Sequence, residues 1–155
     1  MSNTDRIQQD SIKLFTIGFS KKSARQFFRV LQNAGVKKVV DIRLNNVSQL
    51  AGFTKKDDLE FFLQAIGRIE YEHCPEMAPT KDMLDGYMKK KLSWPEYDER
   101  FSKLMIERAI ENVEKPVGLD HACLLCSEPK ADKCHRRLVA EYLQSKWGNV
   151  EILHL

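Results

Sequence analysis

The sequence has no long hydrophobic run and little net charge. Of its 155 residues, 43% are hydrophobic and 30% are charged, and 25 Lys and Arg against 22 Asp and Glu give a net charge of +3. No apolar stretch approaches the roughly 20 residues of a membrane-spanning helix, and the polar start MSNTDRIQQDS lacks the apolar centre of a signal peptide. We therefore expect a cytoplasmic protein without a membrane partner, whose mild positive charge slightly favours anionic partners.

Cysteine is scarce, with four residues in the chain. In a protein of this class, four cysteines are expected to be thiols rather than a disulfide framework. The tyrosine-phosphatase signature, a Cys followed by five residues and an Arg, is absent, because Asp132 stands at the required position after Cys126 and the next arginine is Arg136. That mechanism is therefore not supported.

A zinc knuckle is also unsupported. Cys123 and Cys126 enclose two leucines, which suit a strand rather than a tight turn, and strand residues at this spacing face opposite ways. A structural zinc bound by Cys126 with Cys134, His135 and either Cys74 or His73 remains a minor alternative, because the ligand spacing is wrong. We expect no metal and no cofactor, and we expect Cys123 and Cys134 to be mainly core residues.

Alternating short apolar runs and helical patterns predict an α/β protein. The runs predict five strands, at 13–18, 36–43, 69–74, 122–126 and 149–155. Helical spacing with polar caps predicts helices that begin after Ser20 or Ser23, at Thr54, at Thr80, at Ser93 and at Asp132. The first strand-helix-strand unit favours parallel pairing. We predict one α/β domain at 13–155 with a mainly parallel sheet, preceded by a flexible N-terminal tail at 1–12.

Three of the predicted strands end in polar groups. Ser20 follows the first strand, Asp41 and Arg43 end the second, and Cys126 ends the fourth. Because the carboxyl ends of parallel strands share one edge of a sheet, we expect these side chains around one concavity. Asp41 lies within an apolar run and needs a charged partner, which is either Arg43 or Arg136.

The stretch 119–143 concentrates the reactive groups. Cys126 can be a nucleophile if His135, Arg136 or a helix N-terminus lowers the pKa of its thiol, but a half-buried core thiol is equally compatible with the sequence. His135 is either an acid/base or a packed residue at the helix start, and Glu128 is either a base or a solvated turn carboxylate.

Arg136 is, with Arg43, a candidate for binding an anion. With Asp132 as the helix cap, Arg136 would be about the fourth residue of the helix, and its guanidinium could fold back toward the helix start. Free N–H groups and the helix dipole already favour negative charge there, and a planar guanidinium can hold two oxygens at once.

Five motifs, in combination and order, resemble the uncharacterised family called domain of unknown function 488. They are TIGFS at 16–20, DIR at 41–43 with Ser48 downstream, YEHCPE at 71–76, CSE at 126–128 and CHR at 134–136. The resemblance covers nearly the whole chain from residue 13 onward. It implies a Rossmann-like three-layer α/β fold with a site at the strand ends, and it adds Ser48 to the candidate binding residues. It brings no established reaction.

These observations lead to two hypotheses of different class. The first is an enzyme that acts on a phosphorylated or otherwise anionic small molecule or nucleotide, with Cys126, Glu128 and His135 as catalytic residues. The binding residues would then be Ser20, Asp41, Arg43, Ser48 and Arg136. The second is a non-catalytic module that binds a nucleotide or nucleic acid through the same pocket. The sequence leaves open whether the protein is an enzyme.

Overall fold

A computed structural model describes residues 11–46, 52–128 and 130–155. Its centre is a parallel sheet with the strand order β3-β2-β4-β1-β5. The strands are β1 (Ile12–Gly18), β2 (Lys38–Asp41), β3 (Glu70–His73), β4 (Ala122–Cys126) and β5 (Val150–His154). The helices are α1 (Ala24–Ala34), α2 (Lys56–Gly67), α3 (Lys81–Met88), α4 (Trp94–Arg108) and α5 (His135–Trp147), joined in places by short 3-10 turns.

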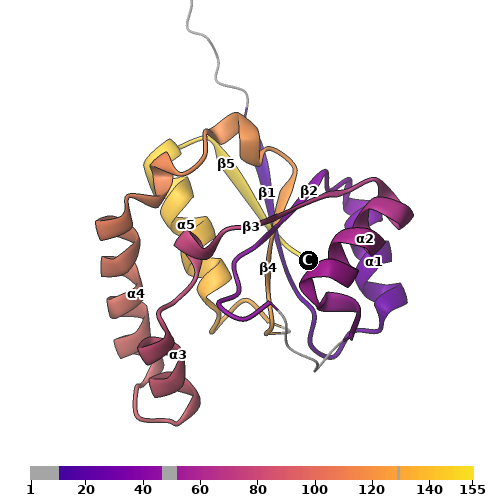
Figure 1. Cartoon of the computed structure of the whole chain (residues 1–155). Coiled ribbons are helices and arrows are strands. Elements are labelled where there is room, and N and C mark those ends of the chain that lie inside the picture. The colour runs from indigo at the N-terminus through magenta and orange to yellow at the C-terminus, as the bar shows by residue number, and fades with distance from the viewer. Residues whose placement is uncertain (1–10, 47–51, 129) are drawn as a thin grey trace, which may run out of the picture.

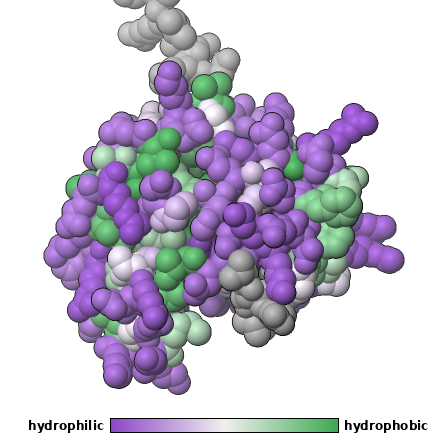
Figure 2. Space-filling view, viewed as in Figure 1, coloured by the Kyte–Doolittle hydropathy of each residue, from purple (hydrophilic) through white to green (hydrophobic). Residues whose placement is uncertain are grey.

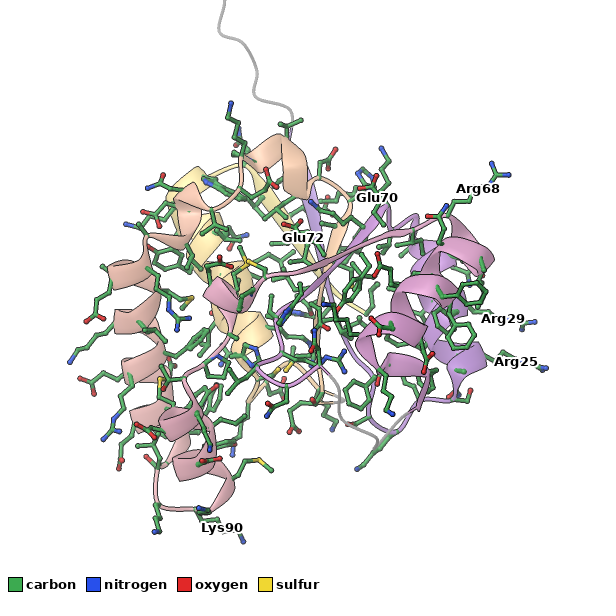
Figure 3. All side chains as sticks on the ribbon, viewed as in Figure 1. Arg25, Arg29, Arg68, Glu70, Glu72 and Lys90 are labelled. Atoms are coloured by element: carbon green, nitrogen blue, oxygen red, sulfur yellow. The ribbon has the colours of Figure 1, made fainter. Side chains whose placement is uncertain are left out.

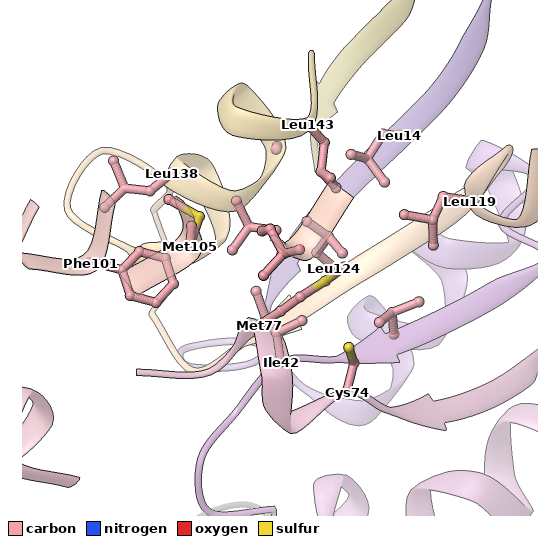
Figure 4. Close-up of a cluster of buried hydrophobic side chains, with 14 of the residues drawn as sticks. Leu14, Ile42, Cys74, Met77, Phe101, Met105, Leu119, Leu124, Leu138 and Leu143 are labelled. Atoms are coloured by element: carbon pink, nitrogen blue, oxygen red, sulfur yellow. The ribbon is translucent and has the colours of Figure 1, made fainter. Parts of the chain in front are cut away.

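Helices cover both faces of the sheet, which gives the predicted Rossmann-like, three-layer fold. Helices α1 and α2 lie on one side, and α4 and α5 lie on the other (Figure 1). Side chains alternate along the strands between two cores. Leu14 and Leu124 belong to the core beneath α4 and α5 (Figure 4), whereas Phe15 and Leu125 belong to the core beneath α1 and α2. The prediction of one α/β fold with a five-stranded sheet is confirmed.

Strand β4 lies between β1 and β2, which corrects the expectation that the first strand-helix-strand unit pairs directly. Strands β1 and β2 are parallel, but each of them pairs with β4 and not with the other. Every residue of β4 is buried, and an entirely apolar strand is most stable where neighbours cover both of its edges and helices cover both of its faces. In register, Gly18 lies beside Cys126 and Asp41 beside Leu125. The ends of β1 and β2 therefore flank Cys126.

Two helices begin at residues other than those predicted from the sequence. Helix α5 is capped by Cys134 rather than Asp132, because a turn closed by the Cys134 N–H and the Ala131 carbonyl precedes the helix. Helix α2 begins at Lys56, because Gly52–Thr54 forms a 3-10 turn. Helix α4 ends at Arg108, since Ala109 adopts a left-handed conformation with φ of 48°.

Other boundaries agree closely with the sequence. Ser23 caps α1 in a capping box with Gln26, and Gly35 ends that helix with φ of 76°. Thr80 and Ser93 cap α3 and α4. Of the predicted tail, residues 1–10 lie outside the described part of the chain, and Ile12 is already the first residue of β1.

The face of the molecule shown in Figure 2 is largely polar. Arg25, Arg29 and Arg68 project outward beside α1 and α2 (Figure 3). Hydrophobic side chains in the view of Figure 2 gather mainly where α3, α4 and α5 lie. Among the described residues, no helix combines the length and the apolar character that crossing a membrane requires.

Candidate functional site

A cavity of about 360 Å³ opens at the carboxyl ends of the strands. One part of its wall is polar and comes from the loops after β1, β2 and β4 and from the start of α5. The other part is apolar and comes from α3 and the first turns of α4. Five predicted site residues line the cavity: Ser20, Arg43, Cys126, Glu128 and His135. Asp41 and Arg136 are buried but do not line it, and Ser48 lies outside the described residues.

Cys126 and His135 form a hydrogen-bonded pair in the polar wall. The Cys126 Sγ lies 3.4 Å from the His135 Nδ1, and the His135 Nε2 lies 2.8 Å from the carbonyl oxygen of Ile42. A carbonyl oxygen only accepts, so Nε2 must carry a proton, which leaves Nδ1 of the neutral ring to accept from the thiol. Transfer of the thiol proton to Nδ1 gives a thiolate beside an imidazolium. This is the arrangement in which a cysteine becomes a nucleophile.

The surroundings of Cys126 favour its thiolate. A hydrogen bond from the Cys134 thiol is the main cause that lowers the pKa of Cys126. The backbone N–H groups of Ser127 and Glu128 and the positive charge of Arg136 lower this pKa further, while burial opposes them. The pKa of Cys134 is raised, chiefly because it donates to Cys126 and is itself buried. Cys134, which the sequence assigned mainly to core packing, is thus also a partner of the candidate nucleophile.

The start of α5 contributes to the same field. Its cap residue, Cys134, makes no side-chain bond to the free N–H groups of the first turn. Helix α5 has 13 residues, and the N-terminus of a helix carries about half a positive charge. Cys134, His135 and Lys133 all line the cavity. The helix start therefore favours negative charge on Cys126 or on a bound anion.

Asp41 is paired with Arg43, which resolves the choice that the sequence left open. The Arg43 Nε and Nη2 each lie 2.8 Å from a carboxylate oxygen of Asp41, and Nη2 also donates to the Thr54 carbonyl at 2.6 Å. The Tyr71 hydroxyl donates to the same carboxylate at 2.6 Å. Burial and this hydrogen bond raise the pKa of Tyr71, so the hydroxyl stays protonated.

One nitrogen of this buried pair is unused. Arg43 is 3% exposed and lines the cavity, and its Nη1 is buried without a hydrogen-bond partner among the described residues. The Phe19 ring lies 5.4 Å from the guanidinium carbon and adds a cation–π contact. A buried guanidinium N–H without a partner is costly. Nη1 is therefore the donor of this buried pair that remains for another acceptor.

Arg136 holds the loop after β4 rather than the cavity wall. It is 1% exposed, its Nε donates to the Thr16 hydroxyl at 3.3 Å, and its Nη1 donates to the Glu128 carbonyl at 2.5 Å. It is the second residue of α5 rather than about the fourth, and it does not line the cavity. An anion-binding role for Arg136 stays a prediction, and its contacts favour a positioning role.

Gly18 makes this arrangement possible. A Cβ atom at Gly18 would lie 1.5 Å from the Glu128 carbonyl oxygen and 2.9 Å from the Arg136 Nη1. Only a residue without a side chain lets the end of β1 approach the Glu128 backbone so closely. The glycine of the TIGFS motif therefore fixes the loop that carries the N–H groups beside Cys126.

The sequence reasoning missed the aromatic wall. Tyr87, Trp94 and Tyr97 line the cavity and contact one another, with the Trp94 and Tyr97 rings stacked at 5.4 Å. One feature of the sequence could have pointed to this wall. The region at 75–115 interrupts the alternation of strands and helices, and long insertions in compact domains are often functional. Helical periodicity within that region indicates only which residues are buried.

A metal ion has three candidate donors in the site. The ligand atoms of Cys126, Cys134 and His135 lie within 4.8 Å of one another, and the described residues supply no fourth donor within that range. Two thiolates and an imidazole suit a soft divalent cation such as zinc. A structural zinc site has four protein ligands, so the set is incomplete for that role. Cys74 bonds to Glu76, and His73 bonds to the Arg43 carbonyl.

Fold and site together define a Rossmann-like α/β protein with a cysteine–histidine pair in a cavity at the strand ends. The family model for "Domain of unknown function DUF488" matches residues 23–143. The chain belongs to this family, as the motifs indicated. No curated protein and no solved structure matches the chain.

Proposed function

We propose that the protein is an enzyme that acts on a phosphorylated or otherwise anionic small molecule, with Cys126 as the nucleophile. The observation that carries the proposal is the Cys126–His135 pair, whose geometry leaves Nδ1 able to take the thiol proton. The thiolate would attack an electrophilic carbon or phosphorus of the substrate and displace a leaving group, to which the imidazolium can return the proton. Glu128, at the cavity wall, could then activate the water that releases the product.

Arg43 would bind the anionic group of the substrate. Its Nη1 lacks a partner among the described residues, and Asp41 fixes the orientation of the guanidinium through two hydrogen bonds. Ser20 and Lys133 line the same cavity and can add a hydroxyl and a positive charge. A fixed donor costs little ordering energy when the ligand binds, which favours affinity.

A nucleotide is the class of substrate that suits the cavity best. Its volume of about 360 Å³ lies in the range of small-molecule sites. The wall formed by Tyr87, Trp94 and Tyr97 can contact a flat ring, and such a contact contributes roughly 1 to 3 kcal/mol per base. A base against the aromatic wall and a phosphate at Arg43 would use both halves of the cavity.

We expect Cys126 to react with iodoacetamide faster than the other cysteines at pH 7. Because its pKa is lowered, the alkylation rate of Cys126 should level off at a lower pH than that of an ordinary thiol, whose pKa is near 8.5. Burial raises the pKa of Cys74 to about 12, and it also raises the pKa of Cys123. These two cysteines are internal controls. Site-resolved mass spectrometry over a pH series measures the rates.

The matched variant for this experiment is His135→Gln. It removes the imidazole that accepts the thiol proton, so the rate at neutral pH should fall and the pH profile of Cys126 should move upward. Circular dichroism and a thermal melt confirm that the variant is folded. Alkylation of Cys126 no faster than that of Cys123 in the wild-type protein would contradict a nucleophilic role.

We expect Lys133→Ala to weaken the binding of a nucleoside monophosphate by about fivefold, which corresponds to roughly 1 kcal/mol for a charge at the rim of a site. Lys133 is exposed and lines the cavity, so the melting temperature of the free protein should not change. Isothermal titration with AMP, ribose 5-phosphate and inorganic phosphate separates the base from the phosphate contribution.

The control for this titration is Lys103→Ala, an exposed lysine of α4 that does not line the cavity. Equal AMP affinity in the two variants would remove Lys133 from the site. Binding of AMP without accelerated alkylation of Cys126 would instead favour the second candidate, a non-catalytic nucleotide-binding module. The aromatic wall and Arg43 support that candidate, because neither needs the thiol.

A further inference from the structure

Cys134 is a second thiol within reach of the candidate nucleophile. The two sulfur atoms lie within 4.8 Å of each other. Both thiols belong to the cavity wall, although Cys126 is only 5% exposed and Cys134 only 2%. They lie eight positions apart, at the end of β4 and at the cap of α5. A small oxidant that enters the cavity therefore meets both sulfurs at once.

The remaining cysteines are placed where they cannot take part. Cys123 faces the core beneath α1 and α2, on the side of the sheet away from α5. Cys74 donates a hydrogen bond to Glu76 at 3.4 Å and belongs to the opposite core. Neither lines the cavity. The fold thus isolates one pair out of four thiols, all of which are reduced in this structure.

We propose that Cys126 and Cys134 are an oxidation site, at which a peroxide converts the two thiols into a disulfide. The Cys126 thiolate attacks one peroxide oxygen, so that the S–O bond forms and the O–O bond breaks. The departing hydroxide takes the proton from the His135 imidazolium and leaves as water. Cys126 is then a sulfenic acid.

The second step uses Cys134. Its sulfur attacks the Cys126 sulfur, the S–S bond forms, and the S–O bond breaks. The hydroxide leaves with the Cys134 thiol proton as a second water. In sum, one hydrogen peroxide and two thiols give one disulfide and two waters. An external dithiol reduces the disulfide back to the two thiols. This inference rests on the proposed function in that Cys126 is the nucleophile in both, but the oxidation does not need the substrate of the enzyme.

A disulfide here would protect the nucleophile. Without a nearby thiol, a sulfenic acid is oxidised further to a sulfinic acid, which dithiothreitol does not reduce. Cys134 would prevent this further oxidation, because its sulfur lies within 4.8 Å of the Cys126 sulfur. The same bond would block the proposed enzyme reversibly, because Cys126 could no longer attack a substrate.

Treatment with hydrogen peroxide and peptide mapping test the proposal. The folded wild-type protein is oxidised, its remaining thiols are alkylated under denaturing conditions, and the digest is analysed by mass spectrometry. We expect a Cys126–Cys134 disulfide that dithiothreitol reverses. In Cys134→Ser, which keeps a hydroxyl donor beside Cys126, the disulfide should be lost. Cys126 should instead be trapped as a sulfenic acid by dimedone and then accumulate as a sulfinic acid.

Cys123→Ala is the matched control, and it should form the same disulfide as the wild type. A wild-type protein that accumulates sulfinic acid at Cys126 without a disulfide, or that links Cys126 to Cys123 or Cys74, would overturn the proposal. If Cys134→Ser does not fold, the peptide map of the oxidised wild-type protein still tests whether the Cys126–Cys134 disulfide forms. Fast alkylation of Cys126 without disulfide formation refutes this inference alone, whereas slow alkylation refutes the nucleophile of the proposed function.

Discussion

Asp41→Ala is expected to destabilise the protein by roughly 3 to 5 kcal/mol, because removing one partner strands the other charge in a poorly solvated site. Asp41 is fully buried and Arg43 is 3% exposed. The carboxylate accepts two side-chain bonds from Arg43, one bond from the Arg43 backbone and one from the Tyr71 hydroxyl. The free energy of unfolding, measured in urea, should fall by this amount.

Two further variants separate the stranded charge from the lost contacts. Asp41→Ala combined with Arg43→Met should be more stable than Asp41→Ala alone, since the double variant no longer buries an unpaired guanidinium. Glu99→Ala removes one partner of an exposed ion pair in α4 and should leave stability almost unchanged. A double variant no more stable than the single one would show that charge burial is not the cause.

The double variant of Asp41 and Arg43 also tests whether Arg43 binds a ligand. Asp41 holds the Nε and Nη2 atoms of the Arg43 guanidinium and thereby fixes the direction of the unpaired Nη1. The double variant should therefore fold but lose the binding of phosphate-containing ligands. If it kept wild-type AMP affinity, Arg43 would be a structural residue only.

Gly18→Ala is expected to have the largest effect on the site itself. The added Cβ would lie 1.5 Å from the Glu128 carbonyl oxygen, which is a bonding distance rather than a contact distance. The loop after β4 must move, the Arg136–Glu128 bond must break, and the N–H groups of Ser127 and Glu128 must turn away from Cys126. Overpacking of this kind costs typically about 1 to 3 kcal/mol, and sometimes more.

The reactivity of Cys126 is the specific readout for Gly18→Ala. We expect its alkylation rate at pH 7 to fall, because the backbone hydrogen bonds from Ser127 and Glu128, which contribute to its lowered pKa, are lost. Gly52→Ala is the control, since a Cβ there meets no described residue within 4 Å. Wild-type stability together with wild-type alkylation in Gly18→Ala would contradict the close approach of β1 to the Glu128 backbone.

The sequence by itself determined the elements and the edge of the sheet that carries the site. Apolar runs and helical spacing encode burial, and burial within a segment depends mostly on that segment's own pattern. The rule that parallel strands share their carboxyl edge then predicts that Ser20, Arg43 and Cys126 lie near one cavity. The need of buried Asp41 for a positive partner was also readable, because it is a matter of charge and hydrophobic context.

Only the tertiary structure decided which groups meet. It placed β4 between β1 and β2, selected Arg43 over Arg136 as the partner of Asp41, and directed Arg136 to the Glu128 carbonyl. It also brought the aromatic wall of α3 and α4 over Cys126 and moved the start of α5 to Cys134, beside that thiol. These outcomes depend on strand order and on contacts between residues far apart in the chain. Local periodicity does not fix either, because the apolar pattern of β4 favours a central strand but does not say which strands lie beside it.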